Sequence, residues 1–147
     1  MTPQVKIILL AVDFSEAASF LAAYAKLFAK GLGANVVVVY VSPSMNRYAS
    51  LYVPTTSIQA LVEQILEGAK RVMDEFMTEN FPGENAAGLV EYGYAPEKII
   101  EVATEVEADM IIMGTHGRRG VNRIPFGSVA EKVVKTAKIP VLTIRPV

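Results

Sequence analysis

The sequence predicts one doubly wound α/β domain over residues 1–147, with a five-stranded parallel sheet covered by helices on both faces. Strand-like and helix-like patterns alternate along the chain, which is typical of parallel strands joined by right-handed crossovers. The strand candidates are nearly unbroken apolar runs, as expected for strands buried on both faces. A length of 147 residues and a hydrophobic content of 52% suit a single domain with a large core.

The five strands are predicted from runs of aliphatic or β-branched residues. Val5–Val12 is almost entirely apolar, and Asn35–Val41 contains four consecutive valines, which favour a buried strand. Ala87–Tyr92 is a weaker run. Asp109–Gly114 is short and ends at a glycine, and Val141–Arg145 follows a proline. Because these runs lack the alternation of half-exposed strands, they predict a sheet with two covered faces.

Four helices are predicted between these strands from apolar residues at helical spacing. Ser15 is a suitable N-cap for the first helix, which should end near the glycines at 31–33. Ser57 begins the second helix after a long loop over residues 42–54. Pro96 lies in the first turn of the third helix, where proline is tolerated, and Ser128 opens the fourth as its N-cap.

Ligands of open parallel sheets bind at the carboxyl ends of the strands, where the strand order reverses. Asp13, Val41 and Gly114 end or follow three of the predicted strands. A site that uses both Asp13 and Gly114 requires the first and fourth strands to be neighbours. The sequence alone does not fix the strand order, but this requirement predicts one in which these two strands are adjacent, as in the order 3-2-1-4-5.

A glycine motif follows the fourth predicted strand and points to an anion site. It reads Gly114-x2-Gly117-x9-Gly127-Ser128 and lies between this strand and the last helix. Glycine allows a ligand to approach the backbone closely, and the N–H groups of a helix start favour a phosphate. The alternative is a solvated loop whose glycines only make turns, but the spacing favours a site.

Local charge supports the same interpretation. The segment from Met110 to Ala130 contains no acidic residue, whereas the whole chain has a net charge of only −1. We therefore expect a phosphate-bearing ligand, and we expect neither nucleic acid nor a membrane surface as a partner. The basic residues of the segment, which are candidate phosphate contacts, are His116, Arg118, Arg119 and Arg123.

Several common sites are excluded. The chain has no cysteine and one histidine, which removes disulfides, thiolate zinc sites and cysteine nucleophiles. No Gly-Lys pair exists for a Walker A loop, and the turn after the first strand lacks the glycines of a dinucleotide fingerprint. Because the N-terminus leads directly into a strand and no apolar run could span a bilayer, a cytoplasmic protein is expected.

The glycine motif, together with the Val-Ala-Glu-Lys-Val-Val that follows it, resembles the nucleotide-binding signature of the universal stress protein family. Asp13-Phe14-Ser15, the turn at 93–96 and the strand at 139–145 resemble further family motifs, so the resemblance covers the whole chain. It implies ATP as the ligand, a candidate Mg²⁺ on its phosphates, and a homodimer through residues 140–145. The site residues that it implies are Asp13 on the nucleoside, the Val41 main chain on adenine, and Gly114, Gly117, Gly127 and Ser128 on ribose and phosphates, with Val129 in the same nucleotide-binding set.

Some roles stay open. On residue type alone, Asp13 is equally a helix-capping turn residue. We expect His116 to be either solvent-facing or a passive neighbour of the phosphates rather than a catalyst, because its own segment offers no orienting carboxylate. The loop at 42–54 is a lid, a partner-binding element or disordered. The leading hypothesis is an ATP-binding stress-response or signalling switch with an unidentified protein partner. The alternatives are a slow ATPase or phosphotransferase, with at most weak hydrolysis, and a dimeric scaffold with structural ATP.

Overall fold

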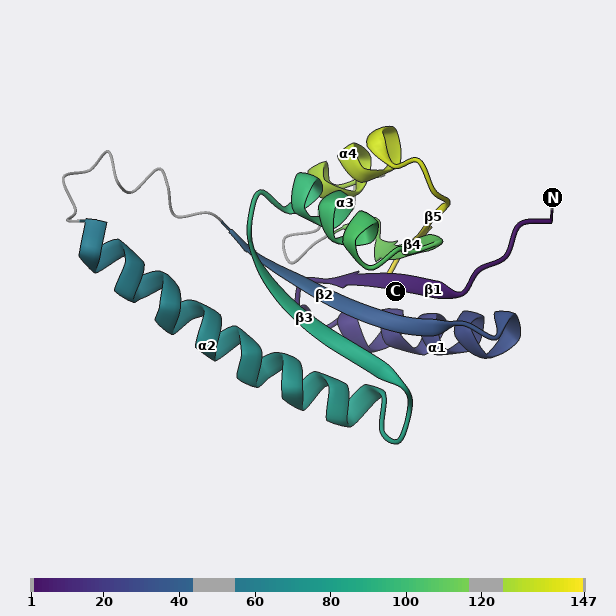
Figure 1. Ribbon diagram of the computed structural model, residues 1–147, viewed down its shortest axis with the longest axis horizontal. Helices are drawn as coiled ribbons and strands as arrows, with labels where there is room; N and C mark the ends of the chain where they lie inside the picture. Colours follow the sequence, from purple (N-terminus) through teal and green to yellow (C-terminus); the bar gives the residue numbers. More distant parts are fainter. Residues whose placement is uncertain (1, 44–54, 117–125, 147) are drawn as a thin grey trace.

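The computed structural model describes residues 2–43, 55–116 and 126–146, which form one sheet with helices on both faces (Figure 1). None of the helices in these ranges is both long and apolar enough to cross a membrane. In chain order the elements are β1 (Ile7–Val12), α1 (Ala18–Leu32), β2 (Asn35–Pro43), α2 (Thr55–Asn80), β3 (Ala86–Gly93), α3 (Ala95–Glu105), β4 (Met110–Gly114), α4 (Ser128–Thr136) and β5 (Val141–Ile144).

The five strands pair in parallel in the order β3-β2-β1-β4-β5, which confirms the predicted order. β1 lies at the centre, where Ile8 is opposite Val36 of β2 and Met110 of β4. Because all the strands run the same way, their carboxyl ends lie along one edge of the sheet. β1 and β4 are adjacent in the sheet, although five elements separate them in the chain, namely α1, β2, α2, β3 and α3.

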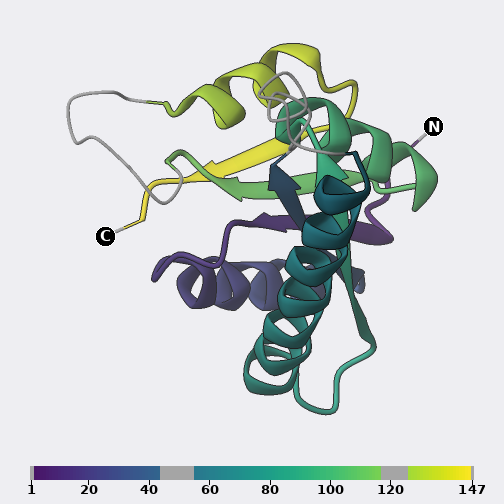
Figure 2. The same ribbon diagram turned by 90° about the vertical axis from the view of Figure 1, so that its left-hand side faces the viewer.

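Helices cover both faces of the sheet because the side chains of each central strand alternate between two apolar layers. Ile8, Leu10 and Val12 of β1 belong to the layer under α1 and α2. Leu9 and Ala11 belong to the opposite layer, under α3 and α4. Figure 2 shows α4 on one side of the sheet and α1 on the other. The unbroken apolar runs of the sequence are the consequence of this double burial.

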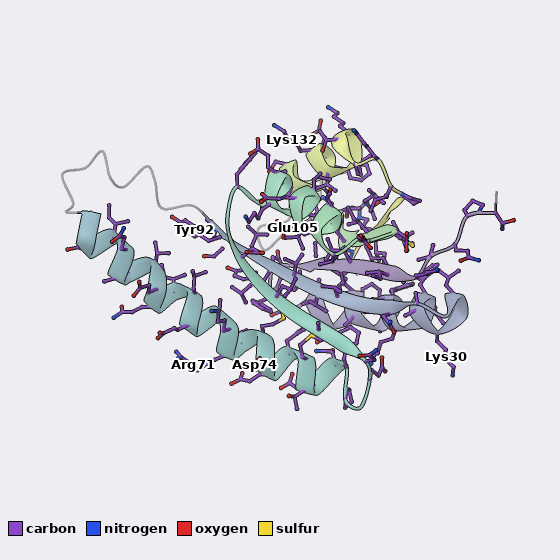
Figure 3. The ribbon with its side chains drawn as sticks, in the orientation of Figure 1. Lys30, Arg71, Asp74, Tyr92, Glu105 and Lys132 are labelled. Carbon is purple, nitrogen blue, oxygen red and sulfur yellow. The ribbon has the colours of Figure 1, made fainter. Side chains whose placement is uncertain are left out.

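Only the second half of α2 packs closely on the sheet. Met73 and Phe76 are buried, whereas Leu61 and Ile65 are exposed on the N-terminal half, which extends past the end of β2 (Figure 1). Charged residues such as Arg71 lie on the side of α2 that faces away from the sheet (Figure 3). The helix is therefore anchored near its carboxyl end.

The predicted strand bounds differ from the structure by one residue at β3, β4 and β5, and by two residues at the start of β1 and the end of β2; the start of α2 also differs by two residues. β1 begins at Ile7 rather than at the predicted residue 5, since the Asp109 carboxylate accepts hydrogen bonds from the N–H groups of Lys6 and Ile7. β2 continues through Pro43 instead of entering the loop after residue 41, because its last residues pair with β3. α2 begins at Thr55, before Ser57, and the rest of the loop, 44–54, lies outside the described residues.

The close contact of β3 with α2 predicts a cost for any side chain at Gly88. A Cβ there would lie 2.7 Å from Cγ of the buried Met73 and 2.9 Å from Cγ of Met77. We expect Gly88→Ala to lower the free energy of unfolding by about 1–3 kcal/mol, measured by urea denaturation. Gly31→Ala is the control, because a Cβ there would meet nothing within 4 Å beyond its chain neighbours and its own helix backbone, and the variant should gain about 0.5–1 kcal/mol. Equal stability of the two variants would contradict this packing.

Candidate functional site

A cavity of about 460 Å³ opens at the carboxyl ends of the central strands. The ends of β1, β2 and β4 form its floor, and the first residues of α3 and α4 form its walls. Its volume lies within the range of small-molecule sites. The cavity thus lies where the reversal of strand order between β1 and β4 predicts a ligand.

The structure brings most of the predicted site residues together around this cavity. Four predicted residues, Gly117, Arg118, Arg119 and Arg123, lie outside the described residues. The predicted residues that line the cavity are Asp13, Val41, Gly114, His116, Gly127, Ser128 and Val129.

The cavity also has lining residues that sequence reasoning missed, and most of them are apolar. Their side chains come from strands and helix starts whose apolar pattern indicated only core. Two of the missed residues could have been found from the sequence. Thr115 lies inside the glycine motif, and Ala95 precedes the first-turn proline of α3. The missed residues are Ala11, Val12, Ser15, Leu21, Val39, Ala95, Ile99, Met113, Thr115, Phe126 and Ala130.

A tight turn after β1 holds Asp13 at the cavity. Oδ1 of Asp13 accepts a hydrogen bond of 2.9 Å from the N–H of Ser15, which makes an Asx turn. Phe14, inside this turn, has a φ of 60°, a left-handed conformation that costs a residue with a bulky side chain roughly 1–2 kcal/mol. The turn is therefore held by contacts outside it.

The same turn corrects the prediction that Ser15 is the N-cap of α1. The helix begins at Ala18, its N-cap is Ala17, and no side chain caps it. Ser15 instead accepts a hydrogen bond from the N–H of Ala18 with its carbonyl oxygen. The Asx turn takes the backbone of Ser15 out of the cap position, so that both Asp13 and Ser15 line the cavity.

The two described ends of the glycine motif are joined by a backbone hydrogen bond. The N–H of Gly127 donates to the carbonyl oxygen of Thr115 at 2.6 Å, and the N–H of Thr115 donates to Ile144 of β5 at 3.0 Å. The buried Thr115 hydroxyl lies 2.9 Å from Nδ1 of His116. These contacts connect β4, β5 and the start of α4 into one side of the cavity.

Gly127 rather than Ser128 is the N-cap of α4, which corrects the predicted cap. Ser128 is the first helical residue, and its side chain is exposed at the cavity. The N–H groups of a first helical turn have no acceptor within the helix, so this end of α4 favours an anion. Glu131, in the same turn, is paired with Lys135 at 2.7 Å, and this hydrogen bond and charge lower the pKa of the exposed Glu131 carboxyl.

The cavity is lined by two chemically different groups of residues. Val39, Val41, Ile99 and Met113 give it an apolar side that suits a flat, weakly polar group. Asp13, Thr115, His116 and Ser128, together with the starts of α3 and α4, give it a polar side. A ligand that carries an apolar ring at one end and hydroxyl or anionic groups at the other matches this arrangement.

Fold and cavity define a small parallel α/β protein with a cavity at the switch point of its sheet. Residues 4–145 match the model of the universal stress protein family, and the chain belongs to this family. The universal stress protein in QAH/OAS sulfhydrylase 3'region of Thermus aquaticus is 36% identical over 141 residues, covering 95% of this chain and 98% of the relative.

Solved structures share the fold. Protein MJ0577 of Methanocaldococcus jannaschii superposes with a TM-score of 0.85 at 28% identity, and the match covers 98% of each chain. The universal stress protein from Archaeoglobus fulgidus in complex with dAMP superposes with a TM-score of 0.62 at 24% identity, covering 98% of this chain and 100% of that chain. At that identity the likeness shows the fold.

Close packing around Gly114 predicts that a branched side chain there destabilises the protein. A Cβ would lie 3.3 Å from the carbonyl oxygen of His116 and 3.4 Å from Cδ1 of Leu21. We expect Gly114→Val to lower the free energy of unfolding by about 1–3 kcal/mol in thermal denaturation. Gly68→Ala, whose nearest neighbour is an Arg71 guanidinium nitrogen at 3.8 Å, should keep or raise stability. If the Gly114→Val protein were as stable as Gly68→Ala, the residues around Gly114 would not be closely packed.

Proposed function

We propose that this protein binds an adenine nucleotide, with ATP as the leading ligand, in the cavity at the ends of β1 and β4. The observation that carries the proposal is the joining of an apolar side and a helix N-terminus in one cavity of about 460 Å³. Adenine suits the apolar side, and phosphates suit the start of α4. The family supports the same ligand class, since one solved protein of this fold is a complex with dAMP and another with cAMP.

Each residue takes a role from its place in the cavity. Val41 offers main-chain groups at the end of the apolar side, and Asp13 offers a carboxylate for ribose hydroxyls. Gly114, Gly127 and Ser128 allow the phosphates close to the backbone. We also assign Val129 to this site. On the basis of the sequence motif, we assign contacts with the phosphates to four further residues, Gly117, Arg118, Arg119 and Arg123. Mg²⁺ is assigned to the phosphate oxygens of the nucleotide.

The proposed output is a conformational or partner-binding state rather than turnover. The supporting observation concerns His116, whose imidazole is the side chain in the glycine motif best suited to acid–base catalysis. Its Nδ1 lies 2.9 Å from the hydroxyl of the neighbouring Thr115. That contact fits a structural neighbour of the phosphates. A turnover faster than about 1 per second with ATP, the lower end of ordinary enzyme rates, would favour the alternative of an ATPase.

We further propose that the protein forms a homodimer through β5. β5 is an edge of the sheet, and all four of its residues are only partly buried, whereas five of the six β1 residues are buried. Leu142 and Ile144 lie against one core layer and Val141 against the other. An apolar unpaired edge invites pairing with a second strand, and a twofold pair is the commonest symmetric solution.

Nucleotide binding is tested by calorimetric titration of ATP into the wild-type protein and two variants. Asp13→Ala and Ser128→Ala should each weaken binding by about 1–3 kcal/mol, because each removes a hydrogen bond to a polar part of the nucleotide. Ser19→Ala, which changes an exposed serine of α1 away from the cavity, should bind like the wild type. Unchanged affinity in both cavity variants would place the nucleotide elsewhere.

The dimer is tested by light scattering on two edge variants. Leu142→Asp places a charge on β5 and should yield monomer, because the charge would be buried in the pair of strands. Ala87→Asp places the same charge on an exposed position of β3, the opposite edge, and should leave the dimer unchanged. Dissociation by Ala87→Asp but not by Leu142→Asp would move the interface to β3.

A further inference from the structure

The ring of Phe14 is anchored on the side of the sheet opposite to α3 and α4. Its centroid lies 4.6 Å from that of Tyr40 on β2 and 6.0 Å from that of Phe76 on α2. Tyr40 and Phe76 belong to the layer under α1 and α2, and Phe14 packs against the same layer. Phe14 therefore connects the turn after β1 to both β2 and α2.

The neighbours of Phe14 in the chain have a different environment. Asp13 and Ser15 line the cavity, whereas Phe14 does not. The backbone between them adopts the left-handed conformation, with a φ of 60°, that turns the phenyl ring away while the two polar residues face the cavity. Because phenylalanine does not favour this conformation, the ring contacts are what select it.

We propose that Phe14 is a positioning residue for the nucleotide site, and that its ring, held between Tyr40 and Phe76, sets the place of the Asp13 carboxylate. This inference rests on the proposed nucleotide-binding function and adds to it a residue that touches no ligand. The rings of Phe14, Tyr40 and Phe76 form an aromatic clamp that fixes the position of the Asx turn. Within the turn, the hydrogen bond from the Ser15 N–H fixes the Asp13 carboxylate.

The same contacts couple the cavity to α2. A ligand that favours the observed turn must also favour the packing of Phe76, because linkage between two sites is reciprocal. Phe76 in turn lies 6.5 Å, centroid to centroid, from Phe81, over whose ring the Lys26 ammonium of α1 lies at 5.9 Å. Nucleotide binding thereby stabilises the anchored half of α2, the helix whose other half extends beyond the sheet.

The first test compares ATP affinity and thermal stability in variants of the aromatic residues. Phe14→Leu should weaken ATP binding about five- to tenfold, whereas Phe14→Tyr, which keeps the ring, should stay within about twofold of the wild type. The control is Phe81→Leu, a buried aromatic residue that contacts Phe76 but not Phe14 in the ring cluster. It should lose stability without a comparable loss of affinity.

If Phe14→Leu does not fold, Tyr40→Leu serves in its place, since it removes the nearer ring of the clamp and leaves Phe14 itself unchanged. If a folded Phe14→Leu or Tyr40→Leu protein lost stability but kept its ATP affinity, Phe14 would only stabilise the core. That result would overturn the inference.

A double-mutant cycle with Asp13 separates positioning from direct contact. If Phe14 acts through Asp13, Phe14→Leu should have little further effect on ATP affinity in an Asp13→Ala background. Fully additive losses would mean that Phe14 acts on the ligand by another route, and would overturn the positioning role. Amide hydrogen exchange supplies an independent readout, because ATP should slow exchange around residues 73–81 in the wild type and less so in Phe14→Leu.

The wild-type titration distinguishes the two proposals. A folded wild-type protein that binds no adenine nucleotide refutes the proposed function and, with it, the role of Phe14. Wild-type binding that is equally tight in Phe14→Leu refutes only the role of Phe14 and leaves the nucleotide site in place.

Discussion

The parallel pairing of β1 with β2 on one side and with β4 on the other determines where everything else in this protein lies. Each pairing is a local backbone ladder, but together they place the residues after Val12 and after Met113 at one edge of the sheet. The crossovers then take α1 to one face and α3 and α4 to the other, and a cavity is left between the helix starts. A site composed of distant chain segments follows from the strand order alone.

The turn at Asp13 shows how such a site keeps an unfavourable backbone conformation. A left-handed phenylalanine would relax in an isolated peptide, yet it persists here because its ring packs with Tyr40 and Phe76. The stabilising contacts are on the α1 and α2 side, while the polar groups that the turn presents lie at the cavity. Core packing on one face thus supports the geometry of the candidate site at the strand ends.

The opposite side of the cavity depends on hydrogen bonds rather than on packing. Thr115 donates its N–H to Ile144 of β5 and accepts a hydrogen bond from Gly127 at the start of α4. The position of the helix N-terminus is therefore linked to the edge strand that we propose as the dimer interface. The candidate site and the edge strand are thus joined by consecutive backbone hydrogen bonds.

The sequence alone determined the alternation of strands and helices and the glycine motif, because apolar periodicity and glycine spacing are local properties that the chain carries in any conformation. The strand order was predicted by a further step, which required Asp13 and Gly114 to share one site. It also indicated seven of the residues that line the cavity, from Asp13 to Val129. Only the tertiary structure decided the boundaries that depend on distant partners, such as the start of β1 at the Asp109 carboxylate. It also decided the apolar lining of the cavity and the ring contacts of Phe14, since the sequence pattern of a buried valine or phenylalanine does not indicate which distant residues it will contact.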